Sequence, residues 1–552
     1  MMKRTLELAI VSLAALALTA AMTYPLIEQA GTSGRIGLND GRWSIWIVSW
    51  VAHALTSAPW TVLDANIFYP HRQALLFSEP NFGAGLLAVP AWALTGNPIL
   101  AHNTATLASF VLSATATYYL AKHLTANRRA SAVAGIIFAF CPYVFAHTAH
   151  IQLLMTAGLP LILLALHRLA DRPSIGRGVA LGAALAAQAL SCGYYGVLGA
   201  LLAVGGVLFF AAAGRWRDGR YWLSALAGAA LCAAIVMPVL VLYLDAQRVS
   251  GFGRTLHAAA EYSAVWQSYL ASAAWAHRWM VPRLGRFGEV LFPGACALVL
   301  AAIGVVAAGR GGPRRKVAIF YALVALFGFW LSLGPAGGLY LILHNTLPVF
   351  SFLRAPSRFG LSVTLALAVL SAMGVEAVAR KNAMGARVAA VLPAIVAAEL
   401  FMAPLPLLRM PPVPAPYKMM ANLPRGPVAE FPFFATRAQI EFHALYMLWS
   451  TYHWQPLING YSDITPADFG PLSRSLATFP GPAAFDALRM RDTKYIVVTF
   501  PRYPPEERLA IAQKLEVLKW QLRLLSRQHD VALYEVVSWE GLTSRGPGGP
   551  SF

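Results

Sequence analysis

The sequence has little charge for its length. Asp, Glu, Lys and Arg together make up only 12% of the 552 residues, whereas 58% are hydrophobic, and soluble domains carry about 25% charged residues. A chain built only of soluble domains is therefore excluded. The apolar residues gather in blocks near the length of about 20 residues that a helix needs to cross a hydrocarbon layer about 30 Å thick.

Several chemical signatures are also missing. There is no GxxxxGK[ST] phosphate loop, no GxSxG elbow and no HExxH pair, which argues against nucleotide hydrolysis and against hydrolases or zinc proteases of those types. The four cysteines show no CxxC or other metal-ligand spacing, so we interpret them as small residues embedded in the membrane.

Acidic residues are few, and the formal net charge is +19. Many basic residues lie in short loops between apolar blocks, where retention of Lys and Arg on the cytoplasmic side places them. We therefore interpret the charge as a sign of membrane topology and expect no nucleic-acid partner.

Apolar blocks predict about 11 transmembrane helices, which would make the chain an α-helical polytopic membrane protein. Two shorter blocks at 43–56 and 82–95 are richer in Trp, and we interpret them as re-entrant or interfacial. The expected spans are 6–25, 99–121, 130–147, 152–168, 177–193, 195–213, 221–244, 290–309, 317–334, 360–379 and 388–406.

Alternate loops differ in charge, which predicts the orientation. Six short segments are basic and are assigned to the cytoplasm with the N-terminus. The loops at 26–98, 245–289 and 335–359 are longer and aromatic, and are assigned to the outside together with everything after 406. The basic segments are 3–4, 122–129, 168–177, 215–220, 310–316 and 380–387.

The composition changes after residue 406. A Pro-rich linker at 407–418 separates the membrane domain, 1–406, from a small extracytoplasmic α/β domain at 419–540. The tail at 541–552 is rich in Gly and Pro and is expected to be disordered. Within the α/β domain we expect strands at 428–434, 456–461, 494–500 and 531–537, and helices at about 468–490 and 505–525.

Motifs spread over residues 25–380 resemble a family of bacterial multi-spanning glycosyltransferase-like proteins, similar to the GT-C superfamily. A weaker resemblance to the same family follows at Asn459-Gly460-Tyr461-Ser462. The motifs are Asp40-Gly41 with Trp46 and Trp50, Phe68-Tyr69-Pro70, Ser78-Glu79-Pro80, Asn97-Pro98, His102-Asn103, Phe140-Cys141-Pro142, His147, His150-Ile151-Gln152-Leu153-Leu154 and Leu353-Arg354-Ala355-Pro356-Ser357-Arg358-Phe359.

This resemblance implies a GT-C-like transferase in the bacterial cytoplasmic (inner) membrane. It implies transfer of a sugar from a polyprenyl-phosphate donor to a glycan, lipid or protein acceptor of the cell envelope. An acid in the first external loop is the catalytic base of the superfamily, and here that role falls on Asp40. Without the resemblance, we would interpret Asp40 as a solvated loop carboxylate or a helix cap. Because Asp40 is followed by Gly41 rather than by a second acid, a divalent metal is left open.

Other polar residues on the external side are candidates for the same site. Glu79 could orient an acceptor or bind a cation, or could simply favour a helix start. Arg354 and Arg358 could bind the donor phosphate, or could anchor the helix among lipid headgroups. We expect the following residues to line the substrate cavity: Arg42, Trp43, Tyr69, His147, His150, Tyr194, Tyr262 and Glu289.

Two other functions remain open at this point. A transporter or flippase of lipid-linked glycans would place ionisable groups near the middle of the bilayer and show internal repeats, and neither feature is evident. A non-catalytic membrane scaffold would not need so many spans and such long loops. The pattern favours the transferase.

Overall fold

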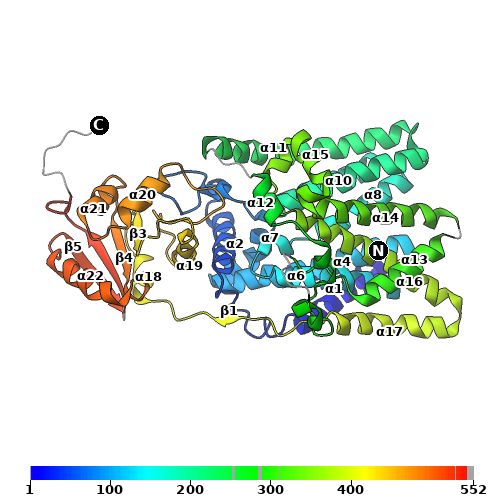
Figure 1. The fold of residues 1–552 in the computed structure, drawn as a ribbon, viewed down its shortest axis with the longest axis horizontal. Helices are drawn as coiled ribbons and strands as arrows, with labels where there is room; N and C mark the ends of the chain where they lie inside the picture. The colour runs from blue at the N-terminus through cyan, green and yellow to red at the C-terminus, as the bar shows by residue number, and fades with distance from the viewer. Residues whose placement is uncertain (1, 251–254, 284–288, 310, 529, 544–552) are drawn as a thin grey trace.

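A computed structural model describes residues 2–250, 255–283, 289–309, 311–528 and 530–543. The molecule is elongated, with a bundle of long helices at one end and a small sheet-containing domain at the other (Figure 1). Helix α2 (Asn39–Ser57) lies between the two, across the end of the bundle.

The membrane domain is built mainly of helices. Besides α2, its helices are α1 (Met2–Met22), α3 (Phe82–Thr95), α4 (Pro98–Thr125), α5 (Arg128–Ala139), α6 (Pro142–Ala146), α7 (Ile151–Leu154), α8 (Gly158–Asp171), α9 (Ile175–Ser191), α10 (Gly193–Phe210), α11 (Gly219–Ser250), α12 (Leu256–Glu261), α13 (Ala295–Ala308), α14 (Pro313–Ser332), α15 (Leu339–Thr346), α16 (Gly360–Lys381) and α17 (Ala383–Glu399).

Among the described residues, seven helices are long and apolar enough to cross a membrane. The other four predicted spans fall on α4, which has 28 residues, and on the shorter helices α9, α13 and α17. The chain is thus a multi-pass membrane protein, but the predicted count of 11 is not confirmed. The seven are Thr5–Met22, Arg128–Ala146, Ile151–Asp171, Gly193–Arg215, Gly219–Arg248, Arg314–Ser332 and Pro356–Lys381.

Helix α2 does not contact solvent or lipid over most of its length. From Trp43 to Ala52 every side chain is buried, because α3 and α4 pack on one side and α19 (Ala444–Ser450) of the C-terminal domain packs on another. A helix that is apolar all round has to be covered all round. The prediction of an interfacial segment is therefore refined, since protein rather than lipid covers α2.

The C-terminal domain is built on a four-stranded sheet in the order β3-β4-β6-β5. Strand β3 (Val428–Phe431) is parallel to β4 (Tyr495–Thr499), and β6 (Val531–Val536) is antiparallel to both β4 and β5 (Leu522–Gln528). The remaining helices of this domain are α18 (Ala415–Met420), α20 (Phe469–Leu476), α21 (Pro482–Arg489) and α22 (Pro505–Val517).

Three local predictions in this domain are wrong. The segment 456–461 is not a strand and makes only one bridge, between Leu457 and Val428. The helix expected at 468–490 is interrupted between α20 and α21, where Pro480, Gly481 and Pro482 disfavour helix. The helix expected at 505–525 ends at Val517, and β5 begins at Leu522.

The Pro-rich linker at 407–418 is not an unattached connection, because parts of it form secondary structure. Leu408–Arg409 forms strand β2, which pairs with β1 (Ser33–Gly34) of the first external loop, and α18 begins at Ala415. Most of the predicted disordered tail, 544–552, lies outside the described residues.

A buried carboxyl group lies in the middle of this domain. The Glu430 side chain on β3 is buried and accepts a hydrogen bond of 2.6 Å from the Tyr417 hydroxyl. The Asn459 side-chain amide makes two hydrogen bonds with the Glu430 backbone. It accepts from the N–H at 2.7 Å and donates to the carbonyl at 2.9 Å. Burial disfavours the charged form and raises the pKa of Glu430 to about 8.

This raised pKa predicts a pH-dependent stability. Between the ordinary pKa of 4.5 and about 8, the folded state keeps a proton on Glu430 that the unfolded state has lost. Stability therefore falls as pH rises through this window. In Glu430→Gln we expect the unfolding temperature of the purified protein to fall less between pH 6 and pH 9 than in the wild type.

Differential scanning fluorimetry of the full chain in detergent measures this difference. Glu540→Gln, which alters an exposed carboxylate of the same domain, should follow the wild-type pH curve. Parallel curves for the wild type and Glu430→Gln would contradict the prediction.

Candidate active site

The site lies at the N-terminal end of α2, where the bundle meets the C-terminal domain. Asp40 is in the first turn of α2, where the helix dipole favours a carboxylate. The next residue is required to be glycine, because a Cβ on Gly41 would lie 2.1 Å from the Arg35 carbonyl oxygen. This close approach brings the chain into α2 and fixes the direction of Asp40.

Each oxygen of Asp40 has a partner from a different part of the chain. Oδ2 lies 3.2 Å from His150 Nε2, and Oδ1 accepts a hydrogen bond of 3.1 Å from the Tyr461 hydroxyl. The hydrogen bond from His150 is the main cause that holds the pKa of Asp40 below its usual value, and Tyr461 and the charge of Arg354 act in the same direction. The side chain remains 44% exposed, so Asp40 is both ionised and accessible.

A second imidazole–carboxylate pair lies beside the first. His147 Nε2 is 3.4 Å from Glu289 Oε1, which also accepts from the Ser357 hydroxyl at 3.4 Å. The rings of His147 and His150 are 5.8 Å apart. Two acids from distant loops thus converge on one short segment between α6 and α8.

The hydrogen bonding of His147 fixes where one proton lies. Nδ1 is 2.8 Å from the Tyr143 carbonyl oxygen, and a carbonyl only accepts, so Nδ1 carries a hydrogen. Nε2 is therefore the ring nitrogen that faces Glu289, 3.4 Å from its Oε1.

Glu79 is more enclosed than Asp40. Its Oε1 accepts a hydrogen bond of 3.3 Å from the Tyr194 backbone N–H, and its buried Oε2 has no hydrogen-bond partner among the described residues. Burial is the main cause that raises the pKa of Glu79, and the nearby Arg358 opposes the shift. Glu79 is thus enclosed near the charge of Arg358 rather than facing open solvent.

The two arginines lie on aromatic rings just before α16. The Arg354 guanidinium is 4.6 Å from the centre of the Tyr262 ring, and that of Arg358 is 5.1 Å from the centre of the Tyr194 ring. The Tyr194 hydroxyl donates to the Ala355 carbonyl at 2.5 Å. Stacking of this kind orients a guanidinium while leaving its N–H edge available.

Three other residues that were predicted to line the cavity instead make structural contacts around the start of α2 and in the loop that follows it. Arg42 donates to the Ile36 carbonyl at 2.7 Å and to Asn39 Oδ1 at 2.9 Å. Trp43 is buried in the core, and the Tyr69 backbone N–H donates to the Leu457 carbonyl at 2.8 Å. The structure therefore brings together Asp40, His147, His150, Glu289, Arg354 and Tyr262, and places Glu79, Arg358 and Tyr194 in an adjoining group.

The sequence-based search for site residues missed Tyr461, which comes from the other domain. It lies in the segment Asn459-Gly460-Tyr461-Ser462, whose resemblance to the family was the available signal. Ser357 was quoted only as part of a motif, although its hydroxyl reaches Glu289.

Backbone pairing positions this segment. Phe68 N–H donates to the Asn459 carbonyl at 3.1 Å, and Leu457 N–H donates to the Asn66 carbonyl at 2.9 Å. The buried Asn66 side chain accepts from the Trp46 indole at 3.0 Å and donates to the Gln455 carbonyl at 3.1 Å. The first external loop and the C-terminal domain are thereby joined next to Asp40.

A metal site is not evident from these side chains. Within the ranges that the structure describes, no group of three or more His, Cys, Asp or Glu residues is arranged to hold a metal ion. The question of a divalent metal, which the sequence left open, stays open.

Comparisons with known proteins place the fold. No protein-family model matches the chain, and no curated protein matches it in sequence. Arabinofuranosyltransferase AftD from Mycobacteria has a similar structure, with 16% identity and a TM-score of 0.57 over 96% of this chain and 41% of AftD. Thus this chain spans well under half the length of AftD.

Two further solved structures are similar over most of the chain. The oligosaccharyltransferase AglB from Archaeoglobus fulgidus has 13% identity and a TM-score of 0.49, covering 97% of this chain and 75% of AglB. ArnT from Cupriavidus metallidurans has 15% identity and a TM-score of 0.49, covering 100% of this chain and 99% of ArnT. The chain is a multi-pass membrane protein, and its fold is similar to that of the arabinofuranosyltransferase AftD, in agreement with the resemblance that the sequence motifs indicated.

The role of Asn66 can be tested directly. Asn66→Ala leaves the Trp46 indole and the Gln455 carbonyl without this partner, and a buried unsatisfied group costs about 1–3 kcal/mol. We expect a lower unfolding temperature and faster tryptic cleavage after Arg409 and Lys418, both exposed between the two domains. Asn422→Ala, at an exposed asparagine, is the control. Equal cleavage rates in Asn66→Ala and wild type would show that Asn66 does not hold the domains together.

Proposed function

We propose that this protein is a membrane glycosyltransferase that moves a sugar from a polyprenyl phosphate to a cell-envelope acceptor on the extracytoplasmic side. The observation that carries the proposal is the state of Asp40, which is ionised, partly exposed and fixed by His150 and Tyr461. The GT-C fold supports the same reaction class.

Asp40 is proposed as the general base. Its oxygens each hold one neighbour and retain a lone pair for an acceptor hydroxyl. As the acceptor oxygen attacks the anomeric carbon, the bond from that carbon to the donor phosphate oxygen breaks, and the acceptor proton passes to Asp40. Attack opposite to the leaving phosphate inverts the anomeric centre. A carboxylate with a lowered pKa accepts this proton late, after the attacking oxygen has become positively charged.

The leaving phosphate gains negative charge, which the arginines would stabilise. Arg354 acts on Asp40 through its charge, so it is proposed to bind the phosphate nearest the reacting bond. Arg358, whose charge acts on Glu79 and whose guanidinium lies over the Tyr194 ring, is proposed to bind the phosphate from the other side. Guanidinium groups bind phosphate oxygens in a forked geometry. Glu79 acts through Arg358 and is therefore proposed as a positioning residue.

After transfer, Asp40 must release the acceptor proton. Because its side chain is 44% exposed, Asp40 can lose this proton to water and so return to its ionised form. The neighbouring pair of His147 and Glu289, 3.4 Å apart, is proposed to hold the segment that carries His150 in place.

The placement outside the cell rests on charge. The basic segments at 122–129, 168–177 and 215–220 lie at ends of helices that run away from Asp40, and positive loops favour the cytoplasmic side. The C-terminal domain would then face the periplasm or cell wall with the acceptor, and the N-terminus would lie in the cytoplasm.

The role of Asp40 predicts a large loss of activity in Asp40→Asn. Removal of a general base lowers the rate by about 10²- to 10⁴-fold, while the amide keeps the size and shape of the side chain. The measurement is transfer by purified protein from polyprenyl-phosphate hexose and pentose donors to cell-envelope glycan acceptors. Glu28→Gln, at an exposed carboxylate of the same loop, is expected to keep wild-type activity. Undiminished turnover by Asp40→Asn would remove Asp40 from the mechanism.

The low pKa of Asp40 predicts that two substitutions shift the pH profile of activity by different amounts. The hydrogen bond from His150 lowers this pKa more than the one from Tyr461 does, so His150→Gln and Tyr461→Phe should both raise it. The acid limb of kcat/KM is then expected to move to higher pH in both variants, and farther in His150→Gln. An unmoved acid limb in both variants would show that another group is the base.

A further inference from the structure

A cavity of about 890 Å³ lies at the opposite end of the bundle from Asp40. It is lined by α1, α4, α8 and α9. The span Ile151–Asp171, which includes α7 and α8, has 21 residues and begins next to His150 of the site. At 1.5 Å per residue, its far end lies about 30 Å away, the thickness of the hydrocarbon layer. The cavity and the candidate active site are therefore at opposite ends of the bundle, about one membrane thickness apart.

The walls of the cavity change character along its depth. The mouth of the cavity is lined by Lys122, Arg168 and Arg177. Leu161 and Ala184 line it seven residues farther along α8 and α9, which is about 10 Å deeper. The cavity is thus cationic at the mouth and apolar below.

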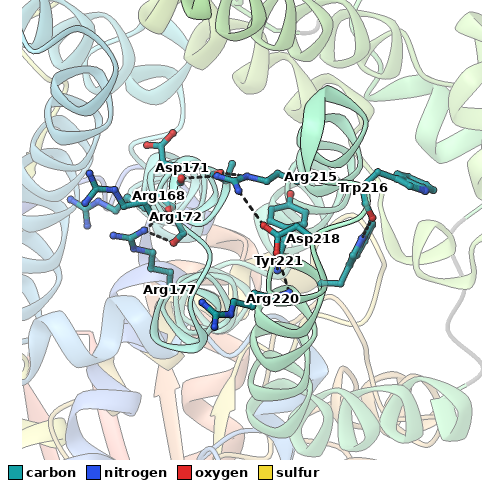
Figure 2. A network of polar contacts seen from close by, with 11 residues as sticks. Arg168, Asp171, Arg172, Arg177, Arg215, Trp216, Asp218, Arg220 and Tyr221 are labelled. Carbon is teal, nitrogen blue, oxygen red and sulfur yellow. Dashed lines mark hydrogen bonds and ion pairs between the residues drawn. The ribbon is translucent and has the colours of Figure 1, made fainter.

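Most of the basic residues near the mouth already have structural partners. The Arg177 side chain caps α8 by donating to the carbonyls of Arg168 and Arg172. From the other side, Arg215 donates to the Ala170 and Asp171 carbonyls at 2.9 and 2.7 Å. Figure 2 shows these arginines converging on the carboxyl end of α8. They satisfy carbonyls that a helix end leaves open.

Arg168 is different, because its guanidinium has no hydrogen-bond or ion-pair partner among the residues that the structure describes. It is exposed, lines the cavity and lies on the side of α8 away from Arg215 (Figure 2). An unpaired guanidinium at the edge of an apolar cavity favours an anionic ligand.

Glu7 is the one carboxylate among the described residues that line the cavity, and it does not oppose such a ligand. Glu7 forms ion pairs with Lys122 and, at 3.3 Å, with Arg128, and accepts from the Tyr118 hydroxyl at 3.0 Å. Its charge is therefore compensated within the protein, and Arg168 and Arg177 remain as net positive charge at the mouth.

We propose that this cavity binds an anionic phospholipid of the cytoplasmic leaflet, with its phosphate at Arg168 and Arg177 and an acyl chain along Leu161 and Ala184. Basic pockets between helix ends bind anionic lipid headgroups in this way. The lipid fills a gap between α1 and α9 that the protein itself leaves open. The proposal is independent of the chemistry at Asp40.

Native mass spectrometry of the delipidated full-length protein tests the proposal, with phosphatidylglycerol and phosphatidylcholine of identical acyl chains as probes. We expect the first phosphatidylglycerol to bind at least about fivefold more tightly than phosphatidylcholine. Arg168→Gln should reduce this preference about fivefold, the factor that one basic residue contributes near an anionic headgroup. Arg220→Gln, at another exposed arginine of the same end that does not line the cavity, should leave it unchanged.

A second pair of variants tests the apolar part. Ala180 and Ala183 are both exposed on α9, but only Ala180 lines the cavity. Ala180→Trp should weaken binding of both lipids, and Ala183→Trp should not. Equal affinity of the wild type for the two lipids, or an equal loss in Arg168→Gln and Arg220→Gln, would overturn the proposal. So would unchanged binding in Ala180→Trp.

Discussion

The candidate site depends on the pairing between the first external loop and the C-terminal domain. Backbone hydrogen bonds join 66–69 to 457–459, and the Asn66 side chain connects Trp46 of α2 with the segment before that pairing. A residue as small as glycine is needed at 460, because a Cβ there would lie 2.6 Å from the Phe68 ring. This close packing brings Tyr461 to Asp40. Without it, the carboxylate would keep its partner from the membrane domain and lose the one from the C-terminal domain.

The electrostatics of the site follow from how unequally its acids are buried. Asp40 is partly open to water and has two hydrogen-bond partners, so its charged form is favoured. Glu79 is enclosed, and its burial disfavours the charged form more than the charge of Arg358 favours it. Environments that push two carboxyl groups apart in pKa are a common basis for distinct chemical roles. The division proposed between a reacting Asp40 and a positioning Glu79 rests on this difference.

Much of the architecture could be predicted from local sequence patterns. Long apolar blocks such as that of α16 locate helices, since the membrane sets their length, and the motifs around Asp40 and Arg354 pointed to a GT-C-like fold. Contacts between distant segments could not be predicted. The acids that pair with His147 and His150 could not be named, because Glu289 and Asp40 reach them only in the folded chain. The helix expected at 505–525 included the first residues of strand β5 (Leu522–Gln528), whose alternation of buried and exposed residues is weak and which lies at the edge of the sheet.

The distance along the chain between Asp40 and Tyr461 has a consequence for biogenesis. Synthesis proceeds from the N-terminus, and N-terminal parts generally fold first. Asp40 therefore leaves the ribosome hundreds of residues before the hydroxyl that completes its hydrogen bonding. A nascent chain, or one that ends before residue 461, has its bundle but lacks the second hydrogen-bond partner of Asp40. Under the proposed function, the protein thus becomes competent only after its C-terminal domain has been made and has docked.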